Sequence, residues 1–156
     1  ARHGALIKHN HKIEGINSRM DSIQASVLNI KLKYISEWTE ARIKNAKIYD
    51  NLLLNIGDII TPKKMANCKH VYHLYVIRTK KRNELKEFLS KNEIQTAIHY
   101  PTALPNLEAY SYLNYKKSDF PVSTAFQDEI LSLPMYPELN LHKIEYVVES
   151  IKNFFR

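Results

Sequence analysis

The longest regular pattern of hydrophobic positions lies between residues 23 and 54. Apolar side chains recur there at steps of three and four residues, and the segment contains neither Pro nor Gly. This spacing is typical of an amphipathic helix, with Asp21 as the N-cap and Gln24 as its capping-box partner. The apolar stripe, which we expect to be buried, comprises Ile23, Val27, Leu28, Ile30, Leu32, Tyr34, Ile35 and Trp38. A single helix of about 32 residues would be nearly 50 Å long and would brace two bodies against each other.

Three shorter apolar runs further along the chain predict β-strands. They cover residues 70–78, 94–100 and 130–134 and are rich in Val, Ile, Tyr and Leu. Pro101 and Pro134 stop the second and third runs. We therefore expect three strands that form one sheet.

Helical patterns separate and follow the predicted strands. Residues 81–93 and 120–129 predict two short helices, the second with Pro121 in its first turn. A last amphipathic helix is predicted from about Leu141. Its expected buried face comprises Ile144, Val147, Val148, Ile151 and Phe154. The order predicts a single α+β domain over residues 1–156, in which a long N-terminal helix precedes a three-stranded sheet covered on one side by helices.

Composition and charge narrow the class of protein. The chain has 156 residues, 44% hydrophobic and 25% charged, which is typical of one globular domain. Its single cysteine, Cys68, cannot form an intramolecular disulfide, and no apolar run reaches the ~20 residues of a membrane span. We therefore expect a cytoplasmic protein with no membrane segment. The chain starts without Met, which suggests a piece of a longer protein.

The net charge of +7 favours an anionic partner. Lys and Arg are spread along the chain, and no nucleic-acid-binding motif accompanies them, so we do not expect nucleic acid to be that partner. A phosphorylated or nucleotide-linked small molecule fits the same charge.

Several kinds of catalytic site find no support in the sequence. It contains no Gly-x-Ser-x-Gly motif, no P-loop and no dinucleotide fingerprint, and it has 3 glycines in all. No feature near Cys68 would activate its thiol. His70 and His73 lie three apart in a predicted strand and would face opposite sides, so we expect no metal site.

Two polar clusters remain as candidates. Asn17, Ser18 and Arg19 precede the first predicted helix, where an amide and a guanidinium suit a phosphate. His99 and Tyr100 stand at the end of a predicted strand, where binding residues commonly lie. From the residues alone, the first cluster is better explained by a polar helix-capping loop, and the second by a hydrogen-bonded histidine and a packed tyrosine.

Taken together and in order, five stretches resemble the C-terminal portion of the DegT/DnrJ/EryC1/StrS family of sugar aminotransferases. These are pyridoxal-phosphate (PLP) enzymes of the aspartate aminotransferase fold type I. The stretches are GINSRMDSIQASVLNIKL from Gly15, HVYHLYVIR from His70, IQTAIHYP from Ile94, Ala-Tyr at 109–110 and LSLPMYPEL from Leu131.

The resemblance implies a small C-terminal domain whose large PLP domain is absent from this chain. It implies a parent enzyme that transfers an amino group, usually from glutamate, to a keto-sugar of a nucleoside-diphosphate sugar, in surface polysaccharide or natural-product biosynthesis. The family's Schiff-base lysine lies upstream, and no lysine here has a matching context, so we expect no catalytic residue in this chain and no activity from it alone.

The resemblance also implies roles for four residues. Asn17 would bind the PLP phosphate in the partner subunit of a homodimer with shared active sites, and Arg19 would contact substrate in the same site. His99 and Tyr100 match the His-Tyr-Pro loop of the sugar-nucleotide pocket. The family commonly reads His-Tyr-Pro-x-Pro-x-His, whereas Ala103 and Pro105 stand at the last two named positions here, which puts sugar specificity in doubt.

Two alternatives stay open at this point. One is a PLP-dependent sugar dehydratase of the same family, in which a His replaces the lysine. The other is a domain that binds a partner or a nucleotide sugar without catalysis. The residues upstream of Ala1 in the native gene would distinguish them.

Overall fold

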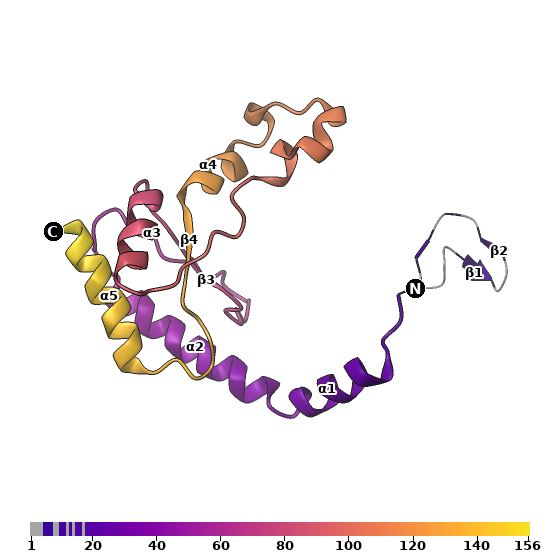
Figure 1. Cartoon of the computed structure of the whole chain (residues 1–156), viewed down its shortest axis with the longest axis horizontal. Helices are drawn as coiled ribbons and strands as arrows, with labels where there is room; N and C mark the ends of the chain where they lie inside the picture. Colours follow the sequence, from indigo (N-terminus) through magenta and orange to yellow (C-terminus); the bar gives the residue numbers. More distant parts are fainter. Residues whose placement is uncertain (1–4, 8–9, 12, 14, 17) are drawn as a thin grey trace. The chain divides into compact units, whose positions relative to one another are not determined.

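The computed structural model describes residues 5–7, 10–11, 13, 15–16 and 18–156 (Figure 1). By its internal contacts the chain divides into two compact units, Ala1–Ser36 and Glu37–Arg156. Each unit is described by itself below. No helix in the described part of the chain is both long enough and apolar enough to cross a membrane.

The first unit contains a short antiparallel pair and one helix. Strand β1 (Ala5–Ile7) pairs with β2 (Asn10–His11), and helix α1 (Ser22–Leu32) follows. The predicted N-cap is confirmed, since the backbone N–H of Gln24 donates to Asp21 Oδ1 over 2.8 Å. Helix α1 begins where the sequence places it because Asp21 satisfies a free N–H of the first turn.

The prediction of one continuous helix is wrong. Helix α1 ends at Leu32 and α2 (Ile35–Leu52) begins after a turn. In that turn the N–H groups of Lys33 and Tyr34 donate to carbonyls three residues back, Ile30 O at 3.3 Å and Lys31 O at 3.0 Å. Packing rather than propensity holds most helices, and α1 has no buried residue among its members, all of which are described. Among the described residues of this unit, no buried side chain of α1 holds the helix continuous with α2.

The expected burial of the apolar stripe is wrong for every member before Trp38, since all of these side chains are exposed. Leu28, on α1, is 50% exposed, whereas Trp38, on α2, is half-buried. Burial begins further along α2, at Asn45, Ala46 and Tyr49.

The sheet of the second unit has two strands. Strand β3 (Tyr75–Arg78) runs antiparallel to β4 (Ile130–Leu133), with Tyr75 opposite Leu133 and Arg78 opposite Ile130. Side chains alternate between the two faces of a sheet. One face carries Tyr75, Ile77, Leu131 and Leu133, which are all buried in the core.

The second predicted strand, 94–100, is reduced to a single bridge, so the expected three-stranded sheet is not formed. Ala97 exchanges both backbone hydrogen bonds with Ser132 of β4. The next pairings would need the N–H groups of residues 134 and 130. Pro134 has no N–H, and the N–H of Ile130 donates to Phe126 O at the end of helix α4 (Pro121–Glu129). Pairing therefore stops on both sides of Ala97.

The first predicted strand is also shorter than expected. Only Tyr75–Arg78 of residues 70–78 is strand. Tyr72 has a φ of 49°, in the left-handed region, and its N–H donates to His70 Nδ1 over 2.9 Å. A left-handed residue interrupts an extended chain, so β3 starts only after it.

The predicted helices of this unit are confirmed. They are α3 (Arg82–Lys91), α4 with Pro121 at its start, and α5 (Leu141–Phe155). Three 3-10 helices, η1 (Leu104–Asn106), η2 (Glu108–Leu113) and η3 (Lys117–Asp119), precede α4. Figure 1 shows α4 leading into β4, with the 3-10 helices beyond it on the side away from α5.

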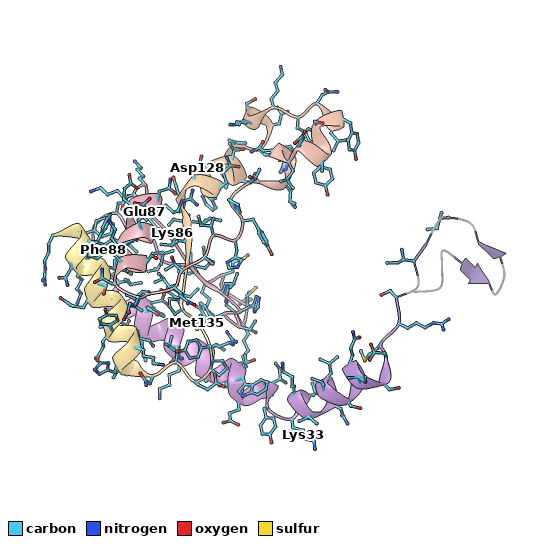
Figure 2. The ribbon with its side chains drawn as sticks, viewed as in Figure 1. Lys33, Lys86, Glu87, Phe88, Asp128 and Met135 are labelled. Atoms are coloured by element: carbon cyan, nitrogen blue, oxygen red, sulfur yellow. The ribbon has the colours of Figure 1, made fainter. Side chains whose placement is uncertain are left out.

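The core lies between α2, α3, α5 and one face of the sheet. Helix α5 buries Ile144, Val147, Val148 and Ile151 as predicted, and Phe154 is half-buried. Figure 2 shows Phe88 on the α5 side of α3, and its ring centroid lies 5.5 Å from that of Phe154. These contacts leave the opposite face of the sheet free for the loops that follow residue 98.

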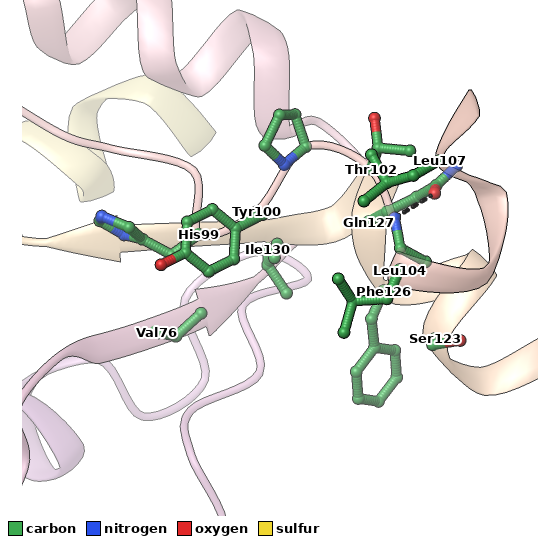
Figure 3. A pocket seen from close by; sticks show the side chains of 12 residues that line it. Val76, His99, Tyr100, Thr102, Leu104, Leu107, Ser123, Phe126, Gln127 and Ile130 are labelled. Atoms are coloured by element: carbon green, nitrogen blue, oxygen red, sulfur yellow. Dashed lines mark hydrogen bonds between the residues drawn. The ribbon is translucent and has the colours of Figure 1, made fainter. Parts of the chain in front are cut away.

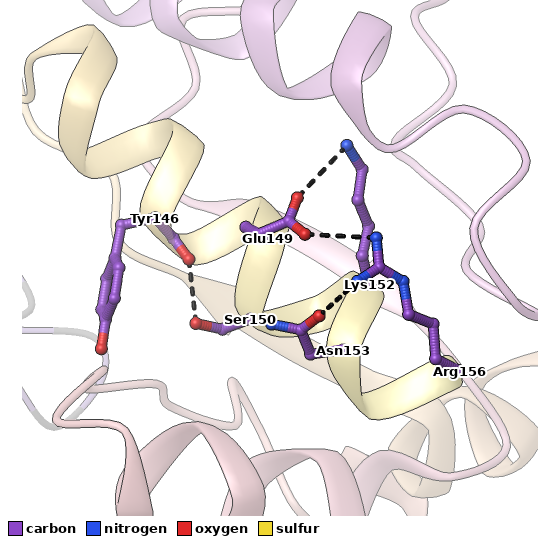
Figure 4. A network of polar contacts seen from close by, with 6 residues as sticks. All are labelled: Tyr146, Glu149, Ser150, Lys152, Asn153 and Arg156. Atoms are coloured by element: carbon purple, nitrogen blue, oxygen red, sulfur yellow. Dashed lines mark hydrogen bonds and ion pairs between the residues drawn. The ribbon is translucent and has the colours of Figure 1, made fainter.

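The solvent side of α5 carries a chain of polar contacts (Figure 4). Glu149 pairs with Lys152 at 3.7 Å and with Arg156 at 3.4 Å. Both pairs are solvent-exposed, and such pairs contribute little to stability. On the same helix the buried Ser150 donates to Tyr146 O over 2.9 Å.

Candidate functional site

A cavity of about 680 Å³ lies on the face of the sheet away from the core (Figure 3). Its floor is formed by Val76 of β3 and Ile130 of β4. These residues alternate with the core residues Ile77 and Leu131, so strand geometry alone turns them to this face. The walls come from the loop after Ala97 and from one side of α4.

His99 and Tyr100, the two residues predicted at the end of a strand, both line this cavity. Their ring centroids lie 5.6 Å apart, at an interplanar angle of 82°. His99 is half-buried, with Nδ1 2.9 Å from Ser132 Oγ, whereas Tyr100 is 74% exposed. The imidazole of His99, which is hydrogen-bonded to Ser132, therefore lies beside the exposed phenol of Tyr100.

Polar contacts with α4 fix the loop that forms the outer wall. Gln127 Oε1 accepts from the backbone N–H of Ala103 at 2.9 Å and from Asn106 Nδ2 at 3.2 Å. The same Asn106 amide donates to Thr124 Oγ1 at 3.2 Å. The sequence did not reveal this contact set, because its partners are 18 to 24 residues apart and follow no periodic pattern.

Charge near the cavity is balanced rather than strongly positive. The guanidinium of Arg78 lies 4.0 Å from the ring centroid of Phe126, a cavity residue, and pairs with Glu129 at 3.1 Å. The lining of the cavity is mostly apolar, and its few polar side chains include His99, Thr102 and Gln127. That arrangement suits a small organic ligand, which apolar walls enclose and polar groups orient.

The first predicted cluster is only partly described. Asn17 lies outside the described residues. Ser18 and Arg19 are exposed and belong to the Ala1–Ser36 unit, just ahead of the N-cap Asp21. Arg19 makes no hydrogen bond or ion pair with another described residue.

No group of three or more His, Cys, Asp or Glu side chains within the described ranges could hold a metal ion. Cys68 is exposed.

Comparison with known proteins identifies relatives that match nearly the whole chain. The family model of the DegT/DnrJ/EryC1/StrS aminotransferase family matches residues 2–152. A pleiotropic regulatory protein from Geobacillus stearothermophilus is 41% identical over 156 residues, which are 99% of this chain and 42% of that protein. The dTDP-3-amino-3,6-dideoxy-alpha-D-galactopyranose transaminase of Aneurinibacillus thermoaerophilus is 33% identical over 97% of this chain and 41% of that protein.

A solved structure supports the fold as well. The crystal structure of DesV from S. venezuelae aligns with a TM-score of 0.89 and 30% identity, over 99% of this chain and 42% of that one. The chain thus spans about two fifths of the length of the curated relatives it matches. By both sequence and fold, the chain belongs to the DegT/DnrJ/EryC1/StrS aminotransferase family.

Proposed function

We propose that this chain is the C-terminal part of a PLP-dependent aminotransferase that acts on nucleoside-diphosphate sugars. The observation that carries the proposal is the cavity in which His99 and Tyr100 meet, within a chain whose family match covers residues 2–152. The transaminase from A. thermoaerophilus is named for a dTDP-amino sugar. The amino donor in this proposal is glutamate, and the acceptor is a keto-sugar.

The residue types ahead of α1 fit phosphate groups, those of PLP for Asn17 and those of the substrate for Arg19. Asn17 and Arg19 offer an amide and a guanidinium next to a helix start, and the Arg19 side chain is exposed with no described partner. An N–H that donates to a phosphate dianion makes a charge-assisted hydrogen bond of about 1.5–3 kcal/mol. When bound, PLP supplies the electron sink through which the amino group passes from donor to keto-sugar.

The chain's own part in this reaction is to bind and orient. In the proposal Asn17 holds the cofactor phosphate, and Arg19 anchors the substrate. His99 and Tyr100 contact the sugar-nucleotide, while Val76, Ile130 and the loop fixed by Gln127 shape the cavity wall around it. Ala103 lines the cavity where the family commonly has Pro, so the identity of the sugar depends on this wall.

We further propose that residues 1–156 act as one domain of a cytoplasmic homodimer with shared active sites. Asn17 and Arg19 would then serve the site of the partner subunit.

The test uses the full-length protein that contains this chain. Asn17→Ala should weaken PLP binding by about ten- to a hundredfold, because one charge-assisted hydrogen bond is lost. Arg19→Ala should mainly raise the apparent KM for the nucleotide sugar. Asn51→Ala, at an exposed position of α2, is the matched control and should change neither.

Mixing two defective subunits tests the shared site. One carries Asn17→Ala and the other lacks the catalytic lysine, and each is weak or inactive alone. A mixed dimer with shared sites has one site with both defects and one with neither, so activity should return. If demonstrated subunit exchange restores no activity, Asn17 does not act across the dimer.

A further inference from the structure

We infer that Ser132 is a positioning residue that fixes the ring and the tautomer of His99, so that the free edge of His99 is a hydrogen-bond donor. The contact between Ser132 and His99 is independent of the proposed function, whereas its effect on substrate binding rests on that function.

Ser132 occupies a constrained position next to the cavity. It is 3% exposed, in the middle of β4, and lies opposite Val76 of β3. On its other side its N–H donates to Ala97 O over 2.7 Å, and its carbonyl accepts from the Ala97 N–H over 3.2 Å. The backbone of Ser132 is therefore held by both neighbouring segments.

The side chain of the same residue adds a third contact to that segment. Two residues beyond Ala97, His99 Nδ1 lies 2.9 Å from Ser132 Oγ. One residue thus holds the 97–99 segment by two backbone bonds and one side-chain bond. This explains how the imidazole stays in place although the predicted strand 94–100 is reduced to one bridge.

The direction of the side-chain bond follows from the inventory of protons. A serine hydroxyl has one proton to donate, and a neutral imidazole has one protonated and one unprotonated nitrogen. Ser132 Oγ has no other hydrogen-bond partner among the described residues. If His99 Nδ1 carried the proton, the hydroxyl proton of Ser132 would have no acceptor among the described residues. Buried polar groups are rarely left without a hydrogen-bond partner. The hydroxyl therefore donates to Nδ1, and the neutral ring carries its proton on Nε2.

The tautomer determines what His99 can recognise. With Nδ1 occupied by Ser132, Nε2–H is the only polar group that the neutral ring can offer to a ligand, and it is a donor. The ligand atom that meets His99 is then an acceptor oxygen, such as a phosphoryl or sugar oxygen of the nucleotide sugar. A ligand that offers only a donor at this point would be rejected.

The first experiment reads the tautomer directly and does not depend on catalysis. Two-dimensional ¹⁵N–¹H NMR of the histidine rings, with the His99 signals assigned through His99→Gln, should show the Nε2–H tautomer in the native chain. Ser132→Ala should give a mixture of tautomers, and Ser132→Thr, which keeps the hydroxyl, should restore the single form. Ser150→Ala removes another buried serine hydroxyl, on α5 (Figure 4), and should leave the His99 signals unchanged.

A native Nδ1–H tautomer, or Ser132→Ala signals identical to the native ones in a chain with native circular dichroism, would overturn the inference. If the alanine variant does not fold, Ser132→Thr still tests the inference. Loss of the single tautomer in a folded threonine variant would also contradict the positioning role of Ser132.

The second experiment is kinetic and separates this inference from the proposed function. In the full-length protein Ser132→Ala should raise KM for the nucleotide sugar about three- to tenfold, as expected for one neutral hydrogen bond, with kcat little changed. The double variant Ser132→Ala/His99→Ala should be no worse than His99→Ala alone. A changed tautomer with an unchanged KM would contradict the proposed role of His99 in substrate binding and leave the positioning role supported.

Discussion

Asn45 is a buried amide that ties α2 to the segment between β4 and α5. Its Nδ2 donates to Leu139 O at 3.0 Å and to Tyr136 O at 3.3 Å, and the residue is 6% exposed. We expect Asn45→Ala to lower the free energy of unfolding by about 1–3 kcal/mol, because the buried carbonyl of Leu139 loses its donor. The half-buried carbonyl of Tyr136 still accepts from the Leu139 N–H at 3.2 Å. Urea denaturation would measure this. Asn51→Ala, at an exposed position of the same helix, should change it by less than about 0.5 kcal/mol; equal effects would contradict the argument.

Two stacked tyrosines in the core link stability to alkaline pH. The rings of Tyr49 and Tyr75 lie 4.9 Å apart. Burial raises the pKa of both hydroxyls, with a further rise from Tyr136 for Tyr49 and from the hydrogen bond to Asp50 for Tyr75. A tyrosine in the unfolded chain has a pKa of about 10, so the unfolded state releases these protons first. Their stabilising contribution is complete below about pH 10 and is lost as the pH rises above it.

We therefore expect the unfolding free energy to fall by about 1.4 kcal/mol per pH unit for each such tyrosine once the pH exceeds about 10. Tyr49→Phe keeps the ring and removes one titrating hydroxyl, so its stability should fall less steeply with pH. Thermal melts from about pH 8 to about pH 11 would measure the slopes. Tyr112→Phe, at a 71% exposed position, is the control and should keep the native slope; a native slope for Tyr49→Phe would refute the assignment.

Gly57, in the turn that follows α2, lies against Phe155 at the end of α5. It has a φ of 51°, and a Cβ there would overlap the ring of Phe155. We expect Gly57→Ala to lower the free energy of unfolding by about 1–2 kcal/mol through the left-handed backbone and by about 1–3 kcal/mol more through overpacking against Phe155.

A double-mutant cycle separates the two effects of this substitution. In a Phe155→Ala background the ring is gone, so Gly57→Ala should cost only the backbone part. Denaturant midpoints of the four proteins give the coupling free energy. Strict additivity would mean that the ring moves aside without cost.

The elements that the sequence predicts well are those whose cause is local. Helix α5 has its apolar spacing and its cap, since Asn140 Oδ1 accepts from the Lys143 N–H at 3.0 Å. Helix α4 has its proline start. The break after Leu32 and the reduction of strand 94–100 to a bridge have causes outside these segments. The first depends on missing tertiary packing, and the second on Pro134 and on the N–H of Ile130.

In the candidate site, too, residues with a local signal could be predicted from the sequence, and the others could not. His99 and Tyr100 could be found from a strand end and a family-like motif, because both signals lie within a few consecutive residues. Ser132 and Gln127 could not, since each acts on a residue 24 to 33 positions away. Position in space, rather than residue type, gives these two their roles.

At the scale of the whole molecule, the two units differ in the burial of their apolar side chains. The Glu37–Arg156 unit contains the buried core, whereas α1 buries none of its residues. Soluble monomers rarely expose large contiguous apolar patches. The large apolar residues exposed on α1 are Ile23, Val27, Leu28, Ile30 and Leu32.

This difference gives a matched pair of substitutions with opposite expected results. Leu28→Asp changes a side chain that is 50% exposed, so the thermal midpoint of the chain should stay within a few degrees of the native value while binding of a hydrophobic dye falls. Leu85→Asp puts a carboxylate at a fully buried position of α3, and the Glu37–Arg156 unit should unfold or melt far lower, because an unpaired charge cannot be buried without a large penalty. Calorimetry and dye fluorescence on both variants would measure this. A severe loss of stability with Leu28→Asp would show that the face of α1 is covered within this chain in solution, and the exposed apolar surface would then need another explanation.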